Sequence, residues 1–208
     1  MPRINEAEHK TQERVLKLFQ NELNYSYYGD LRHQTNTNIM AEKLVEWLMS
    51  PKGGGHSESL SVKAVFELQK TAGNLQQGLY KANQDVYSLL KYGAKVRANP
   101  GESEKTIYFI DWEHSHNNEF AIAEEVTIKD KSERRPDLVV YINGIALAVI
   151  ELKKSTISVS QGVRQNLSNQ NEHFNKPFFT TMQFVMAGNS GEGLRYGTIE
   201  TKEKYYLE

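Results

Sequence analysis

Three ionisable side chains in the second half of the sequence have the types and spacing needed to bind a divalent cation and hydrolyse a phosphate ester. They are Asp137, in the run PDLVVYI, and Glu151 and Lys153, at the end of the run IALAVIELKK. An apolar strand that leads directly into a carboxylate and an ammonium is costly to bury unless these charges are paired or bind a ligand. Because alternate residues of a strand share a face, Glu151 and Lys153 are expected to point to the same side.

The Asn143–Gly144 pair between the two apolar runs predicts a β-hairpin, and the length of its loop decides where Asp137 points. A two-residue turn would pair Asp137 with Ile150 and place the carboxylate on the face opposite Glu151. A three-residue loop that also includes the preceding isoleucine, with its glycine left-handed, would pair Asp137 with Val149. Asp137 and Glu151 would then be diagonal neighbours on one face. We predict the three-residue loop, because only this register builds a site.

Two carboxylates with open coordination positions suit Mg²⁺, which keeps several water ligands and binds phosphate oxygens. The carbonyl of Leu152 could complete the metal shell. Such a cation lowers the pKa of a bound water and neutralises charge that develops on a scissile phosphate. Lys153 could orient the attacking water and stabilise the pentavalent transition state. These residues predict Mg²⁺-dependent hydrolysis of a phosphodiester bond, and a surface ion pair at a strand end is the alternative interpretation.

The elements that must position these residues indicate an α+β fold with a helical N-terminal part. Apolar periodicity predicts helices at about 5–23, 37–49, 59–72, 75–91 and 159–173. Strands are predicted at 95–98, 106–112, 119–128, 136–142, 145–154 and 182–188, with one or two weak strands after them. We expect a single domain over 1–208, with a helical part at about 5–92. A catalytic core of mixed β-sheet flanked by helices is expected at about 95–200.

The overall composition restricts the class of protein. The 208 residues include 25 Lys and Arg against 26 Asp and Glu, which gives a net charge of −1. A protein that binds DNA tightly without partners usually has a basic excess, so this balance argues against such a protein. The absence of cysteine excludes disulfides, zinc–thiolate sites and a cysteine nucleophile. With no secretory signal and no apolar run near the roughly 18–20 residues of a membrane span, we expect a cytoplasmic protein. The end at YYLE predicts a fragment of a longer chain.

The segment that carries the three residues resembles a known family. Pro136–Asp137, thirteen intervening residues and then Glu151–Leu152–Lys153 are similar to the PD-(D/E)XK nuclease motif. The longer string RPDLVVYINGIALAVIELKK, followed by GVRQNLSNQ, closely resembles the N-terminal nuclease domain of type I restriction enzyme R (HsdR) subunits. The similarity spans roughly residues 120–200. It implies a restriction-endonuclease-like core in which Asp137 and Glu151 hold the metal and Lys153 is the catalytic lysine.

The same resemblance implies further residues near the DNA. The family has a Gln-x-x-x-Tyr motif on the helix after the lysine, where this sequence has Gln165 and, at the tyrosine position, Asn169. An acidic residue on the family's first helix matches Glu13, with Glu6 as the alternative. An ordinary solvated helix face is the competing interpretation of these residues. Basic residues that predict either a DNA-facing groove or a solvated loop are Lys129, Lys131, Arg134, Arg135, Lys153, Lys154 and Arg164.

The resemblance also implies a larger machine that acts on double-stranded DNA. An ATP-driven translocase would follow this domain, and methylation and specificity subunits would read the target sequence, which suits the near-neutral charge. ATP would bind only to the full-length protein, because AGNSGEG lacks a G-K-[ST] ending and is interpreted as a turn. His114 and His116 are interpreted as an exposed loop rather than a metal site. Two alternatives are a non-catalytic docking or DNA-positioning module, disfavoured by the intact motif, and a stand-alone repair or resolvase nuclease, disfavoured by the charge.

Overall fold

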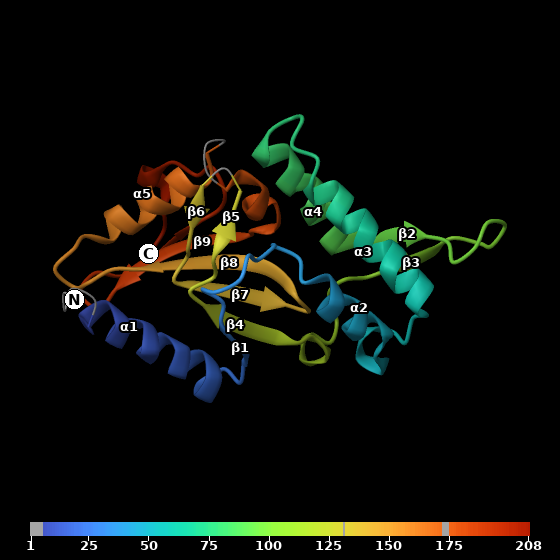
Figure 1. Cartoon of the computed structure of the whole chain (residues 1–208), viewed down its shortest axis with the longest axis horizontal. Helices are drawn as coiled ribbons and strands as arrows, with labels where there is room; N and C mark the ends of the chain where they lie inside the picture. The colour runs from blue at the N-terminus through green and yellow to red at the C-terminus, as the bar shows by residue number, and fades with distance from the viewer. Residues whose placement is uncertain (1–5, 131, 172–174) are drawn as a thin grey trace.

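A six-stranded mixed sheet runs through the structure, which is a computed structural model that describes residues 6–130, 132–171 and 175–208 (Figure 1). In spatial order its strands are β1 (Ser26–Asp30), β4 (Phe120–Glu124), β7 (Leu138–Ile142), β8 (Ile145–Leu152), β9 (Phe184–Asn189) and β10 (Gly193–Gly197). β1 is parallel to β4 and β8 is parallel to β9, whereas the other neighbours are antiparallel. The predicted α+β class with a mixed sheet is confirmed.

Two helices cover opposite sides of the sheet at the end where β8 finishes (Figure 1). Helix α1 (Glu6–Lys17), which continues into a wider π-helical turn at Leu18–Glu22, packs through Leu16 on the face formed by Ala148, Ile150 and Leu152. On the other face, α5 (Val159–Asn169) packs through Val159 and Val163 against Ala187 of β9. β8 is buried along its whole length because both of its faces are covered.

The remaining helices form a second apolar cluster at the opposite end of the sheet (Figure 1). The elements of this cluster are α2 (Ala41–Met49), α3 (Glu58–Ala72), α4 (Leu79–Tyr92) and a hairpin of β2 (Ala94–Val96) and β3 (Lys105–Ile107). Ile145 and Leu147 of β8 belong to this cluster, so β8 connects the helical end with the sheet core. The shorter elements are a β5 (Ile128–Lys129) and β6 (Glu133–Arg134) hairpin and 3-10 turns at Pro51–Gly53, Ser115–Asn117, Lys176–Thr181 and Glu203–Tyr205.

The sequence pattern predicted neither β1 of the main sheet nor the short β6, and it misplaced the division between the helical part and the sheet. β1 lies within the predicted helical part, yet it joins the sheet beside β4. Its sequence, SYYGD, has no regular alternation of apolar and polar residues, and four of its side chains are partly or fully exposed polar or aromatic groups. Residues within or next to the predicted strands 95–98 and 106–112 form the small β2–β3 hairpin, which packs with the helices rather than joining the main sheet. The sheet is therefore not confined to residues 95–200.

Several element boundaries also differ from the prediction. The helix predicted to start at 37 begins at Ala41, because Ile39 forms a β-bridge with Ile145. The helix predicted from 75 begins at Leu79 after the left-handed Gly78. The strand predicted over 119–128 is interrupted at Glu125, whose φ is 53°. α5 ends at Asn169, and the predicted helix limits at residues 5 and 173 lie outside the described residues.

Candidate active site

The hairpin between β7 and β8 sets the position of Asp137, and its turn differs from the predicted loop. Ile142 pairs with Ile145, so Asn143–Gly144 is a two-residue turn with φ values of 52° and 82°. Positive φ at both central residues is the preference of Asn-Gly in a tight hairpin, whose twist matches that of the strands. The prediction of a three-residue loop is therefore wrong.

A β-bulge in β8 compensates for the shorter turn. Tyr141 pairs with Ala146 and Val140 pairs with Ala148, which leaves Leu147 as an extra residue without a partner on β7. The backbone carbonyl of Leu147 instead accepts a hydrogen bond from the Gln183 amide at 2.7 Å. The bulge shifts the register by one residue beyond the turn.

The shifted register brings the predicted carboxylates together. Leu138 pairs with Ile150, and the same register continued by one residue places Asp137 opposite Glu151. The amide of Leu152 donates to Asp137 Oδ2 at 2.6 Å, which fixes this carboxylate beside the end of β8. Asp137 and Glu151 thus reach neighbouring positions on adjacent strands by a route different from the one predicted.

Glu151 and Lys153, here called the Glu151–Lys153 pair, form a largely buried ion pair. Lys153 Nζ lies 2.8 Å from Glu151 Oε1, and the two side chains are 13% and 2% exposed. This geometry follows from strand alternation, which puts the two residues on one face as predicted. An ion pair this far from solvent is sensitive to the loss of either partner, because the remaining charge stays buried.

Helix α5 closes over the Glu151–Lys153 pair at Gly162, a residue that was not predicted to belong to the site. A Cβ at this position would lie 2.9 Å from Ala187 Cβ, 3.5 Å from Lys153 Cγ and 3.6 Å from Glu151 Cγ. The glycine therefore permits a close approach between helix and sheet that alanine would not. A glycine inside a predicted helix is a signal for such an approach.

Directly after the neighbouring strand β4, Glu125 contacts Asp137 through the backbone. Its amide donates to the Asp137 carbonyl at 2.9 Å, and its carboxylate forms an ion pair with Arg135 at 2.7 Å. Gln12 of α1, which is 4% exposed, donates to Glu124 at 2.8 Å and to Glu125 at 3.4 Å. Arg135, predicted to face DNA, is therefore engaged with an acid next to the site.

The acidic residue predicted on the first helix does not reach the sheet. Glu13 is exposed and lies 3.4 Å from His9 on the same helix, whereas the preceding residue, Gln12, faces inward. The side chain of the alternative, Glu6, lies outside the described residues. On α5, Gln165 is exposed, and Asn169 at the family's tyrosine position is buried at 2% exposure. These positions differ from the residues that pack inward only in the direction in which their side chains point around the helix.

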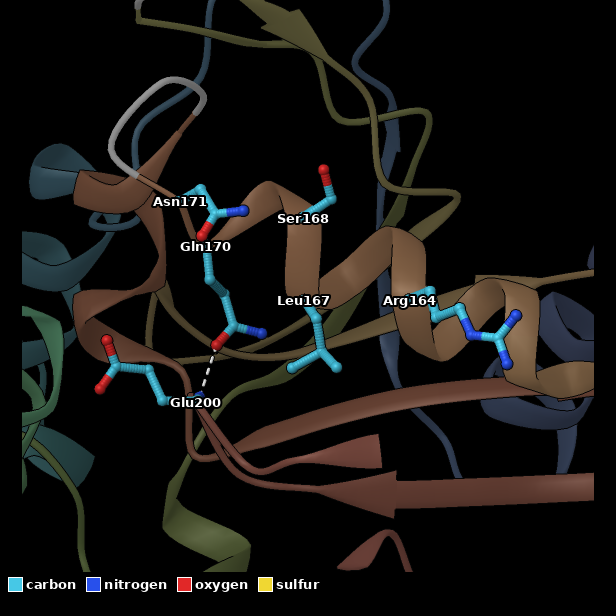
Figure 2. Close-up of a pocket in the computed structure, with 6 residues that line it drawn as sticks. All are labelled: Arg164, Leu167, Ser168, Gln170, Asn171 and Glu200. Atoms are coloured by element: carbon cyan, nitrogen blue, oxygen red, sulfur yellow. Dashed lines mark hydrogen bonds between the residues drawn. The ribbon is translucent and has the colours of Figure 1, made fainter. Parts of the chain in front are cut away.

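Arg164 lies on the outer side of α5, in a separate ion pair. It donates to both carboxylate oxygens of Glu203, at 2.8 and 3.0 Å, and these hydrogen bonds hold the pKa of Glu203 below its ordinary value. Figure 2 shows Arg164 at one end of an open hollow of about 440 Å³ in which Gln170 accepts a hydrogen bond from the Glu200 amide. The structure thus does not bring Arg164 to the Glu151–Lys153 pair.

Lys154, Lys129 and the histidine segment lie in three different surroundings. Lys154 is half-buried at the exit from β8, where its carbonyl accepts a hydrogen bond from Ile157. Lys129 pairs with Glu133 in the small hairpin, and Lys131 lies outside the described residues. The predicted turn-like character of the histidine segment is confirmed, because residues 115–117 form a 3-10 turn and His114 is exposed.

The donor chemistry at the end of β8 fits a hard divalent cation. Within the described ranges, no three His, Cys, Asp or Glu side chains gather closely enough to hold a metal by themselves. A cation here would depend on Asp137, Glu151 and a backbone carbonyl such as that of Leu152, with water or phosphate oxygens in the other positions. Mg²⁺ is commonly bound in this way, by one or two carboxylates with several waters retained.

Comparison with known proteins assigns the family. The family model described as the type I restriction enzyme R protein N terminus matches residues 4–205. The chain therefore belongs to this family, which confirms the resemblance drawn from the RPDLVVYINGIALAVIELKK string. Among the residues that the structure describes, no helix is long and apolar enough to cross a membrane.

Relatives in the family are named as endonuclease subunits. The type I restriction enzyme SsaAORF53P endonuclease subunit of Staphylococcus saprophyticus subsp. saprophyticus is 30% identical over 104 residues, which are 50% of this chain and 11% of that protein. The type I restriction enzyme HindI endonuclease subunit of Haemophilus influenzae is 32% identical over 99 residues, which are 45% of this chain and 9% of that protein. The matches thus span about a tenth of the length of these relatives.

Proposed function

We propose that this chain is the nuclease domain of a type I restriction R subunit and that it hydrolyses phosphodiester bonds of double-stranded DNA with Mg²⁺. The observation that carries the proposal is the 2.6 Å hydrogen bond from the Leu152 amide to Asp137, which holds this carboxylate beside Glu151 and Lys153. The endonuclease names of the relatives support it. The mixed sheet with flanking helices is, on this proposal, a restriction-endonuclease-like core.

Each residue of the site has a distinct role in the proposed reaction. Asp137, Glu151 and the Leu152 carbonyl would hold Mg²⁺, which when bound supplies an acidified water and charge neutralisation at the phosphate. Lys153, held on the same face by Glu151, donates from its ammonium to the phosphate oxygens and to the attacking water. Gly162 keeps α5 close to the pair and so limits the access of bulk water.

The larger assembly is part of the same proposal. A net charge of −1 supplies little non-specific attraction to DNA, so other parts of the enzyme would bring the DNA to the site. ATP-driven translocation would belong to a motor elsewhere in the subunit, and methylation and specificity subunits would select the target. This division of labour explains how a nuclease can act without a basic excess of its own.

A substitution series in the assembled full-length enzyme tests the function. Asp137→Ala, Glu151→Ala and Lys153→Ala are each expected to abolish DNA cleavage while ATP-driven translocation persists, because the proposed roles of these side chains concern only the scissile phosphate and its metal. Glu133→Ala, an exposed acid in the β5–β6 hairpin, is the control and should cut normally. If all three variants cut like wild type, the site is wrong and a docking or DNA-positioning role is favoured.

A further inference from the structure

One buried amide side chain ties the segment between β8 and α5 to the turn between β9 and β10. Asn189 is 7% exposed, and its Nδ2 donates to the carbonyl of Ile157 at 2.7 Å and, more weakly, to that of Lys154 at 3.5 Å. Its Oδ1 accepts from the backbone amides of Gly191 at 2.8 Å and Glu192 at 2.6 Å. Its Nδ2 group therefore binds the segment that follows β8, and its Oδ1 atom binds the turn that follows β9.

The same turn also holds the first residues of α5. Glu192 accepts a hydrogen bond from the Val159 amide at 3.2 Å and one from the Ser158 hydroxyl at 3.3 Å. A carboxylate at this position satisfies an amide of the first helical turn and interacts favourably with the helix dipole. Asn189 orients this carboxylate because it binds the Glu192 amide.

The segment 154–158, which Asn189 holds, connects directly to the Glu151–Lys153 pair at both of its ends. At its start, the Lys153 amide donates to the Gly188 carbonyl at 2.9 Å, next to Asn189 in sequence. At its end, α5 returns to the sheet and places Gly162 against Lys153 and Glu151. The position of the Lys153 ammonium thus depends on how this segment leaves β8 and returns as α5.

We propose that Asn189 is a positioning residue for DNA cleavage, which acts by fixing the 154–158 segment and through it the ammonium of Lys153. This inference rests on the proposed nuclease function. It differs from a merely structural role, in which loss of the amide would lower stability but leave the cleavage rate of folded molecules unchanged. The hydrogen bonds of Asn189 go to backbone atoms of Lys154, Ile157, Gly191 and Glu192, so its effect on the ammonium passes through the chain.

Asn189→Asp in the assembled full-length enzyme tests the proposal. Aspartate keeps the acceptor for the turn amides but removes the Nδ2 donor and places a carboxylate oxygen against the Ile157 carbonyl. The single-turnover cleavage rate at saturating DNA should fall about 10- to 100-fold, as expected for a misplaced catalytic group. DNA affinity and translocation rate should stay unchanged.

Asn36→Asp is the matched control, because it makes the same change in another buried asparagine. Asn36 is 8% exposed, and its Nδ2 donates to the carbonyls of Leu31 and Thr127 at 3.0 Å each, outside β7, β8 and α5. This variant should lose stability but retain the cleavage rate per folded molecule. Normal cleavage by Asn189→Asp, or equal losses in both variants, would overturn the inference. If Glu151→Ala also cut normally, the proposed function itself would have failed.

Discussion

Lys153→Met is expected to reduce DNA cleavage by about 100- to 1000-fold, the range found when a group that stabilises transition-state charge is removed. Methionine keeps most of the length and the apolar stem of lysine, so the packing between β8 and α5 should survive. The ammonium that lies 2.8 Å from Glu151 is lost. Translocation by the assembled enzyme should be normal, and comparing the two activities in one preparation measures the effect.

The same variant should reveal the cost of the buried carboxylate in the absence of divalent cations. Glu151 is 2% exposed, and removing the partner of a buried charge costs roughly 3 kcal/mol. Mg²⁺ should restore more stability to Lys153→Met than to wild type, because the cation can replace the ammonium. Urea unfolding of wild type and of Lys153→Met, with Mg²⁺ or with EDTA, measures both the cost of the buried carboxylate and the stabilisation by the cation.

An exposed lysine provides the control for this measurement. Lys129 lies 3.2 Å from Glu133, with both side chains more than half exposed, so Lys129→Met should change stability by less than about 1 kcal/mol and leave cleavage intact. Equal stability of Lys153→Met and wild type in EDTA would contradict the account of a costly buried pair. Normal cleavage by Lys153→Met would contradict its catalytic role.

Gly162→Val is expected to reduce cleavage by about 100-fold, because an error of about 1 Å in the placement of a catalytic group is enough for this effect. Even the first added carbon would lie 2.9 Å from Ala187, so α5 must move away from the pair. Overpacking of this kind also costs about 2 kcal/mol of stability. Single-turnover cleavage and thermal unfolding measure the two effects.

Gln161→Val separates the clash from helix propensity. Gln161 precedes Gly162 on α5 but is exposed, so this variant places the same β-branched side chain in the helix without contact with the sheet. This control should cleave and unfold like wild type. If Gly162→Val cleaves at the control rate, the close approach of α5 does not matter for the chemistry.

The local part of the site was predictable from the sequence, and the long-range part was not. The same-face arrangement of Glu151 and Lys153 follows from strand alternation, and Asn143–Gly144 identified the hairpin correctly. The bulge was not predictable, because Leu147 leaves the β7 ladder to pack with the helical cluster and bind Gln183. Neither partner is near Leu147 in sequence, so no local pattern encodes the shift.

The residues on helices show a second limit. The amphipathic pattern predicted α1, but it could not show which polar residue of this helix faces the sheet. In the structure Gln12 contacts Glu124 of the sheet, whereas Glu13 pairs with His9 on the helix itself. A rotation of 100° per residue makes neighbouring positions point in very different directions. The edge strand β1 was missed for a related reason, since its position is set by pairing with β4 rather than by its own sequence.

Divalent-cation binding by this chain tests the central claim most directly. Titration with Mn²⁺, followed by electron paramagnetic resonance of the free ion, measures affinity without DNA, ATP or partner subunits. We expect wild type to bind Mn²⁺ and Asp137→Asn and Glu151→Gln each to weaken binding at least about tenfold, since each variant removes one of few protein ligands. Glu133→Gln should bind like wild type. Unchanged affinity in both site variants would contradict the claim that these two carboxylates hold the metal.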